Sequence, residues 1–235
     1  MLIVNNSMPK SGSSLLRHFV VEMIRGVCFK GQRAFTDRIK SGEITGRGTY
    51  VSKLDHHLIV NLLEISQNIG PVLVKVHLPY SDQLEKLLTS RDIFVTYNYR
   101  DPRDMILSAV DHHHRAKAMG QNDFGEYDSI PKALPIAVHW AKQAVLWKRS
   151  SITYDISYKY FLRNKLEVLN HINKAAGFAL PKDTLQGIIN QEVLDRKPGK
   201  NQFNKGLVSR YKNEMSEQDL EMCNSALKDY IDILA

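Results

Sequence analysis

The sequence predicts a three-layer α/β fold, in which helices flank a central parallel sheet. Short runs of β-branched residues alternate along the chain with longer segments whose apolar residues recur every three or four positions. Strands that are separated by helices form βαβ units, and these units give parallel sheets covered on both faces. A length of 235 residues suits one such domain, so we expect residues 1–235 to form a single domain.

The first half of the chain contains three predicted strands. Short apolar, β-branched runs place them at residues 2–4, 72–76 and 93–99. Apolar residues at helical spacing predict helices over 15–27, 57–69 and 82–88. The segment 30–53 is polar and contains four glycines, so it is expected to form a loop or flap.

The second half continues the same alternation. Pro102 occupies a favoured first-turn position and opens a helix that is expected to reach residue 116. A loop over 119–130, a helix over 132–147, a strand over 151–155 and a helix over 159–176 are expected next. A basic segment at 196–206 precedes a final amphipathic helix over 216–234.

Composition limits the choice of partner and compartment. The formal net charge of +7 suits a polyanionic partner, although a solvated basic surface would give the same excess. The two cysteines show no zinc-type spacing, so we expect no metal site and a reducing, cytoplasmic setting. No apolar run approaches the ~18 residues of a membrane span. Nothing in the sequence calls for a nucleic acid as partner.

The segment MPKSGSSLL at 8–16 has the composition of an anion site. It follows a predicted strand and opens a predicted helix, whose first N–H groups and dipole attract negative charge. Lys10 adds a full charge, Gly12 allows close approach of the backbone, and hydroxyls come from Ser11, Ser13 and Ser14. The arrangement is P-loop-like but differs from the G-x-x-x-x-G-K-S/T pattern, because Lys10 precedes the glycine.

Other polar side chains lie where further strands end. Lys75 and His77 are two positions apart at a strand end, so their side chains face the same way. Arg100 ends the next strand, and Ser108 lies two turns into the helix that follows. Lys205 and Gly206 belong to the late basic segment.

These segments together resemble the PAPS-dependent sulfotransferase family, in particular its cytosolic branch (PAPS is 3′-phosphoadenosine 5′-phosphosulfate, and PAP is the product left after transfer). The family patterns P-K-S-G-T-T-W, K-T-H-L-P, Y-R-N-P-x-D-x-x-x-S, Y-E-D and R-K-G-x-x-G-D-W-K-N occur in the same order. In this chain they read PKSGSSL at 9–15, KVHLP at 75–79, YRDPRDMILS at 99–108, Tyr154-Asp155, and NKGLVSRYKN at 204–213. The resemblance covers nearly the whole chain. Two departures are Leu15, where the family has Trp, and Asn204, where it has Arg.

The resemblance implies a role for each matching residue. His77 would act as the base, Lys10 would neutralise the leaving oxygen, and Lys75 would stabilise the sulfuryl oxygens. The loop residues Lys10, Ser11, Gly12, Ser13 and Ser14 would hold the 5′-phosphosulfate. Arg100, Ser108, Lys205 and Gly206 would hold the 3′-phosphate, and Tyr154 would lie against the adenine. The implied cofactor is PAPS.

Several alternatives stay open at this stage. A P-loop-like kinase would also use a basic loop, and a PAP-binding protein on a degenerate sulfotransferase scaffold would bind without turnover. The acceptor would be a small molecule or a carbohydrate with a hydroxyl or amine. Segments 30–53 and 119–130 would line its binding site. Adjacent histidines on a helix point about 100° apart, so the run 112–114 suits solvent or the acceptor side better than a metal. The oligomeric state is not predicted.

Overall fold

The computed structural model describes residues 1–90, 92–120, 125–195 and 206–235, with backbone alone for 192–195. The strands span Leu2–Ser7 (β1), Gly46–Arg47 (β2), Tyr50–Val51 (β3), Val72–Lys75 (β4), Ile93–Tyr99 (β5) and Thr153–Ser157 (β6). The helices span Ser13–Val27 (α1), Lys30–Lys40 (α2), His56–Asn68 (α3), Asp82–Leu88 (α4), Pro102–Ala118 (α5), Ile130–Arg149 (α6), Tyr158–Arg163 (α7), Lys165–Ala175 (α8), Lys182–Asp195 (α9), Tyr211–Glu214 (α10) and Glu217–Leu234 (α11).

The sheet has the order β2-β3-β4-β1-β5-β6. Strands β3, β4, β1, β5 and β6 run parallel, and β2 pairs antiparallel with β3. The sheet is therefore mostly parallel, as predicted. Strand β1 lies between β4 and β5. The chain adds β2, β3 and β4 on one side of β1, and later adds β5 and β6 on its other side. Ligands of open α/β sheets bind outside the carboxyl ends of the strands at such a switch point.

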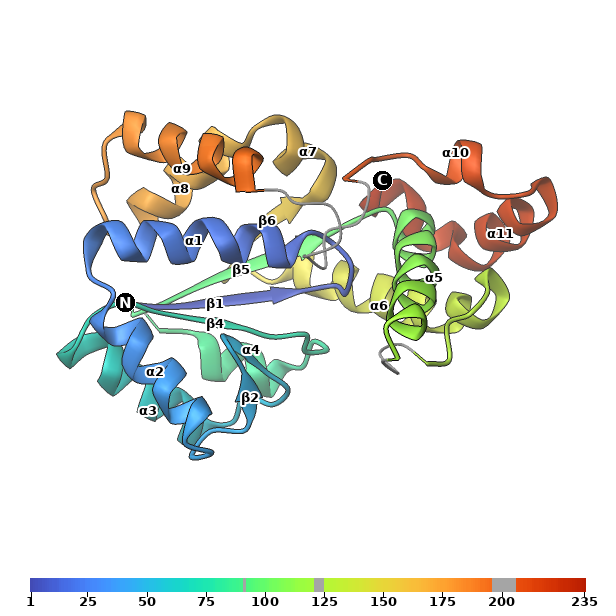
Figure 1. The fold of residues 1–235 in the computed structure, drawn as a ribbon. Coiled ribbons are helices and arrows are strands. Elements are labelled where there is room, and N and C mark those ends of the chain that lie inside the picture. Colours follow the sequence, from blue (N-terminus) through green and yellow to red (C-terminus); the bar gives the residue numbers. More distant parts are fainter. Residues whose placement is uncertain (91, 121–124, 196–205) are drawn as a thin grey trace.

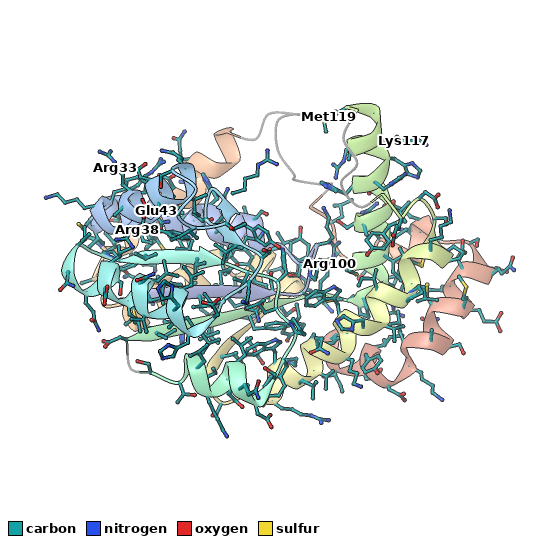
Figure 2. The ribbon with its side chains drawn as sticks, turned by 90° about the horizontal axis from the view of Figure 1, so that it is seen from below. Arg33, Arg38, Glu43, Arg100, Lys117 and Met119 are labelled. Carbon is teal, nitrogen blue, oxygen red and sulfur yellow. The ribbon has the colours of Figure 1, made fainter. Side chains whose placement is uncertain are left out.

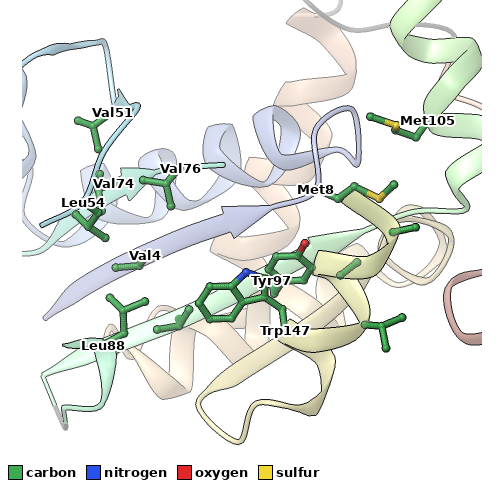
Figure 3. Close-up of a cluster of buried hydrophobic side chains, with 14 of the residues drawn as sticks. Val4, Met8, Val51, Leu54, Val74, Val76, Leu88, Tyr97, Met105 and Trp147 are labelled. Carbon is green, nitrogen blue, oxygen red and sulfur yellow. The ribbon is translucent and has the colours of Figure 1, made fainter. Parts of the chain in front are cut away.

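Alternating side chains of the central strands build two separate cores. Leu2 and Val4 of β1 point into one core, whereas Ile3 points into the other. The first core holds Tyr97 stacked on Trp147, with ring centroids 5.7 Å apart, and Met8 and Met105 lie at its edge (Figure 3). Both faces of the central strands are thus buried, which explains their continuous apolar character.

Helices cover both faces of the sheet and one of its ends. Helices α1, α8 and α9 lie over one face, and α2, α3 and α4 lie over the other (Figure 1). Helices α5, α6 and α11 pack together beside the carboxyl ends of the strands. In the described part of the chain, no helix is long and apolar enough to cross a membrane.

The prediction of a loop over 30–53 is wrong, because this segment contains α2 and the short strands β2 and β3. Two of its residues, Gln32 and Gly31, contact the chain near the start of β4. The amide of Gln32 donates to the carbonyl oxygen of Leu73 (3.2 Å) and accepts from its N–H (2.7 Å). Gly31 lies so close to the neighbouring turn that a Cβ would be 1.9 Å from the Gly70 carbonyl oxygen. The glycine that suggested a loop therefore permits a close helix contact.

Two further differences concern the end of the sheet and the helices after it. Strand β6 runs over 153–157, two residues later than predicted. The helix expected over 159–176 is divided at Asn164, whose backbone leaves the helical region, into α7 and α8. Helix α9 was not predicted. The short helix α10 was not predicted either, and the other helices and strands lie within a few residues of their predicted positions.

Candidate active site

The loop after β1 lies at the switch point of the sheet. Its backbone takes left-handed angles at Lys10 (φ 62°) and Gly12 (φ 87°). The hydroxyl of Ser11 is fully buried and lies 2.6 Å from the carbonyl oxygen of Met8 and 3.0 Å from that of Asn98. Ser11 therefore holds the loop to β5 with its side chain, and only its backbone N–H is left for a ligand.

Helix α1 begins directly after this loop. Gly12 is the N-cap residue, and its carbonyl oxygen accepts from the N–H groups of Leu15 (3.0 Å) and Leu16 (3.1 Å). The N–H groups at the start of a 15-residue helix, with the helix dipole behind them, form an anion site. Ser13 and Ser14 are the first two residues of this helix, so both predicted residues lie at this end.

The ring of Tyr158 lies against the loop. A Cβ at position 12 would be 2.5 Å from Cδ2 of Tyr158, so only glycine fits at this position. The guanidinium carbon of Arg100 lies 4.5 Å from the centroid of the same ring. Tyr158 thus joins the loop to the end of β5, although it was not among the residues proposed from the sequence.

Lys75 connects the end of β4 to the start of α1. Its Nζ donates to Oγ of Ser14 at 3.0 Å. Burial, aided by the positive charge of Arg17, lowers the pKa of Lys75 to about 8. A negative ligand beside this ammonium would offset its desolvation, so the pKa shift points to an anion site.

Lys10 lies in the same positively charged region as Lys75. Burial lowers the pKa of Lys10 to about 8, and the charges of Arg115, Lys75 and Arg100 add to the effect. The predicted residues Lys10 and Lys75 are therefore brought close enough to influence each other. Their mutual repulsion would be relieved by a bound polyanion.

His77 lies beside Lys75, just beyond β4. Its Nδ1 is 2.9 Å from the carbonyl oxygen of Ser7, which can only accept a hydrogen bond, and 2.9 Å from the Ser7 hydroxyl. Nδ1 therefore carries the proton, and Nε2 is the nitrogen that can take one up. Burial and the charge of Lys75 lower the pKa of His77 to about 4, so the imidazole is neutral at neutral pH.

Tyr50 is a second aromatic residue that the motifs did not indicate. It pairs with Lys75 across β3 and β4, and its ring centroid lies 5.7 Å from that of His77. Nζ of Lys75 lies 6.0 Å from the centroid of the same ring. The segment 30–53 thus reaches the predicted base through this residue.

Arg100 lies in the middle of the molecule, between the sheet and α5 (Figure 2). Its side chain is only 6% exposed. Nη2 donates to the carbonyl oxygen of Leu207 (2.6 Å) and to the carboxylate of Asp104 (3.3 Å), and Nη1 reaches the carbonyl oxygen of Lys10 at 3.5 Å. Nε is buried and has no hydrogen-bond partner within the described ranges.

Of the other residues predicted to hold the 3′-phosphate, the structure describes Ser108 and Gly206 but not Lys205. Ser108 is buried in the second turn of α5, on the helix that Arg100 precedes. Gly206 has a left-handed φ of 68° and is followed by the carbonyl of Leu207 that Arg100 contacts. Lys205 and the departure at Asn204 lie outside the described residues.

Among the described residues, the ring of Tyr154 contacts Phe94 and His171 and not the loop. Its ring stacks on His171 with centroids 3.8 Å apart, on the face of the sheet that α8 covers. Tyr158 lies four residues further along the chain, as the first residue of α7, and its ring lies against the loop at Gly12. Because β6 ends later than predicted, the residue near its carboxyl end is Tyr158 and not Tyr154.

The histidine run lies within α5. His113 is buried, and its ring meets that of His114 at a centroid distance of 5.2 Å. Among the residues that the structure describes, no three His, Cys, Asp or Glu side chains are grouped as metal ligands.

Comparisons with known proteins agree with this architecture. A model of the sulfotransferase domain family matches residues 2–232. Mouse sulfotransferase SULT7A1 complexed with PAP has a similar fold, with a TM-score of 0.59 and 15% identity over 97% of this chain and 83% of its own. Retinol dehydratase in complex with retinol and PAP gives a TM-score of 0.57 at 15% identity, over 97% and 80% of the two chains. Curated protein sequences gave no match.

At 15% identity the two crystal structures support the fold alone, and this support agrees with the predicted three-layer α/β architecture. The family assignment comes from the match over residues 2–232, which leaves out only the first residue and the last three. The chain therefore belongs to the sulfotransferase domain family, as its sequence predicts.

Proposed function

We propose that the carboxyl edge of this sheet binds PAPS and that the protein transfers its sulfuryl group to a hydroxyl or amine of a small-molecule or carbohydrate acceptor. The observation that carries the proposal is the 3.0 Å hydrogen bond from Lys75 to Ser14. It holds the strand end that bears His77 against the loop that would hold the phosphosulfate. The family match favours sulfuryl transfer over the kinase alternative.

The residues present suit a nucleotide with phosphates at both ends of its ribose. One end has the loop N–H groups, Lys10 and Lys75, and the other has Arg100 and Ser108. The buried Nε of Arg100 has no partner among the residues described, and an unpaired buried donor of this kind suits a phosphate oxygen. Tyr158, packed against Gly12 and Arg100, is proposed in place of Tyr154 as the aromatic residue beside the nucleotide.

His77 is proposed as the general base. With Nδ1 donating to Ser7, its Nε2 can accept the proton of the acceptor hydroxyl or amine. The lowered pKa keeps this nitrogen unprotonated at neutral pH, although it also makes His77 a weaker base than an ordinary histidine. Tyr50 borders the imidazole and is proposed to contact the acceptor.

Lys10 and Lys75 are proposed to stabilise the charge that develops during transfer. PAPS, when bound, supplies the sulfuryl group and leaves as PAP. Lys10 would neutralise the leaving phosphate oxygen, and Lys75 would stabilise the oxygens of the group in transfer. The hydrogen bond to Ser14 holds Lys75 in place before any ligand binds, so little reorganisation of this side chain is needed at the moment of reaction.

The retinol dehydratase structure contains retinol and PAP, which supports a small-molecule acceptor for a protein of this fold. The experiment is an assay of PAP formation from PAPS with a panel of phenols, alkyl alcohols, carbohydrates and amines. Acceptor-dependent PAP formation by the wild type, lost in His77→Ala, supports the proposal. PAP binding without turnover across the panel would favour the alternative of a binding protein on a sulfotransferase scaffold.

A further inference from the structure

Asp104 is a buried carboxylate that joins two parts of the candidate site. It lies in the first turn of α5 and is 1% exposed. One oxygen accepts from Nη2 of Arg100 (3.3 Å) and from the backbone N–H of Ser209 (2.7 Å). The other accepts from the backbone N–H of Tyr211 at 3.2 Å. A single side chain therefore receives hydrogen bonds from β5's end and from the turn that leads into α10.

The same arginine contacts both neighbouring segments by itself. Its Nη2 donates to the carbonyl oxygen of Leu207, two residues after the last undescribed residue, and its Nη1 reaches the carbonyl oxygen of Lys10. Ser209 has a left-handed φ of 58°, an unusual angle for a residue other than glycine. The bond from its N–H to Asp104 helps hold this conformation.

We propose that Asp104 is a positioning residue for recognition of the 3′-phosphate. Its carboxylate fixes the guanidinium of Arg100 in one orientation and holds the segment 206–211 beside it. With Nη2 occupied by Asp104 and Leu207, the guanidinium keeps Nε and part of Nη1 for a ligand. Asp104 itself would touch no part of the nucleotide, because within the described ranges both of its carboxylate oxygens accept hydrogen bonds from protein donors.

The charge and shape of the carboxylate are both needed for this role. Asparagine has nearly the same size but offers one acceptor oxygen, and its amide group is a donor. In Asp104→Asn, that amide would face an arginine or a backbone N–H, both of which are also donors. We therefore expect Arg100 and the 206–211 segment to lose their common anchor while the rest of α5 keeps its packing.

The test compares the affinity of PAP with that of adenosine 5′-monophosphate, which lacks the 3′-phosphate. The inference rests on the proposed function, in which Arg100 holds that phosphate. We expect the wild type to bind PAP more tightly than adenosine 5′-monophosphate. In Asp104→Asn, the ratio of the two affinities should fall by about tenfold, which corresponds to the loss of one charge-assisted hydrogen bond. The affinity for adenosine 5′-monophosphate should stay unchanged. A merely structural role would weaken both ligands equally.

Asp101→Asn is the matched control. Asp101, the N-cap residue of the same helix, forms a similar, largely buried ion pair with Arg103 at 2.7 Å. Among the described residues its carboxylate accepts hydrogen bonds from Arg103 and none from Arg100 or from the 206–211 backbone, although the Arg103 guanidinium lies 3.8 Å from the centroid of the Tyr211 ring. Loss of the ion pair should lower the unfolding temperature and leave the affinity ratio unchanged. If Asp104→Asn does not fold, Asp104→Glu keeps the charge but displaces the oxygens, and a reduced ratio is again expected.

The outcomes separate the inference from the function on which it rests. Equal affinities of the wild type for both nucleotides would contradict the proposed function and the inference with it. A wild-type preference for PAP that Arg100→Ala abolishes, but that Asp104→Asn and Asp104→Glu both retain, would overturn the inference alone.

Discussion

Nδ1 of His77 donates to the carbonyl oxygen of Ser7 at 2.9 Å, across the adjacent ends of β4 and β1. This bond selects the tautomer that leaves Nε2 as the basic nitrogen. It also ties the proposed base to the strand that leads into the phosphate loop. The orientation of the imidazole is therefore set by the central sheet.

The first prediction concerns this base. His77→Ala should lower kcat by about 10²–10⁴, the usual contribution of a positioned general base. The affinity for PAP should be unchanged, because within the described ranges His77 contacts Ser7 and Tyr50 but not Arg100 or the loop amides. Steady-state kinetics and calorimetric titration of PAP measure the two effects. A variant that keeps wild-type kcat would exclude His77 as the base.

The second prediction concerns pH. The base must be neutral, which holds above a pKa of about 4, and the lysines must be charged, which holds below a pKa of about 8. The value of kcat/KM reports the free enzyme, so it should stay nearly level from about pH 5 to 7 and fall as the pH passes through 8. A profile of kcat/KM against pH measures this. Half-loss of activity near pH 6.5 would show an ordinary histidine instead.

The third prediction compares two glycines with nearly the same backbone angle. Gly12 has φ 87° and Gly42 has φ 84°, but a Cβ would meet the Tyr158 ring at position 12 and nothing within 4 Å at position 42. Gly42→Ala should cost about 1 kcal/mol of unfolding free energy from the left-handed backbone alone. Gly12→Ala should cost about 1–3 kcal/mol more because of the clash, and PAP affinity should fall.

Chemical denaturation of both variants, with PAP titrations, checks this comparison. Gly42→Ala is the control for backbone strain, because a Cβ at this position would meet no atom within 4 Å. Equal losses of stability and unchanged PAP affinity in the two variants would mean that the contact between position 12 and Tyr158 does not shape the loop.

The fourth prediction separates two tyrosines. Tyr158→Leu should weaken PAP binding about tenfold, because the ring packs against both Gly12 and Arg100. Tyr154→Leu removes the stack with His171 and should lower the unfolding free energy by about 1 kcal/mol without a change in PAP affinity. Titrations of PAP into both variants test this prediction. If Tyr154→Leu weakened PAP binding and Tyr158→Leu did not, Tyr154 would be the tyrosine of the nucleotide site.

The strand ends and the loop were predictable from sequence because each carries a local signal. Lys75 and His77 follow a β-branched run at a spacing of two, and parallel strands bring their carboxyl ends together. The order of the motifs then placed Arg100 near Lys10, and the structure shows that this is so. The positions of these residues could therefore be predicted without placing the helices.

Other parts of the site depend on contacts that a sequence pattern does not reveal. Helix α2 was missed because Gly31 and Gln32 serve contacts with residues about forty positions away. Tyr158 was missed because β6 extends two residues further than its apolar run indicates. Tyr50 gains its place by pairing with Lys75 across a two-residue strand, which is too short to be recognised from pattern.

The most direct test of the account is a calorimetric titration of PAP into the wild type and into Arg100→Ala, with ATP as competitor. We expect tight binding of PAP by the wild type, a loss of about tenfold to a hundredfold in the variant, and much weaker binding of ATP. Absence of PAP binding by the folded wild type, or equal binding by the variant, would contradict the assignment of this edge of the sheet as a PAPS site.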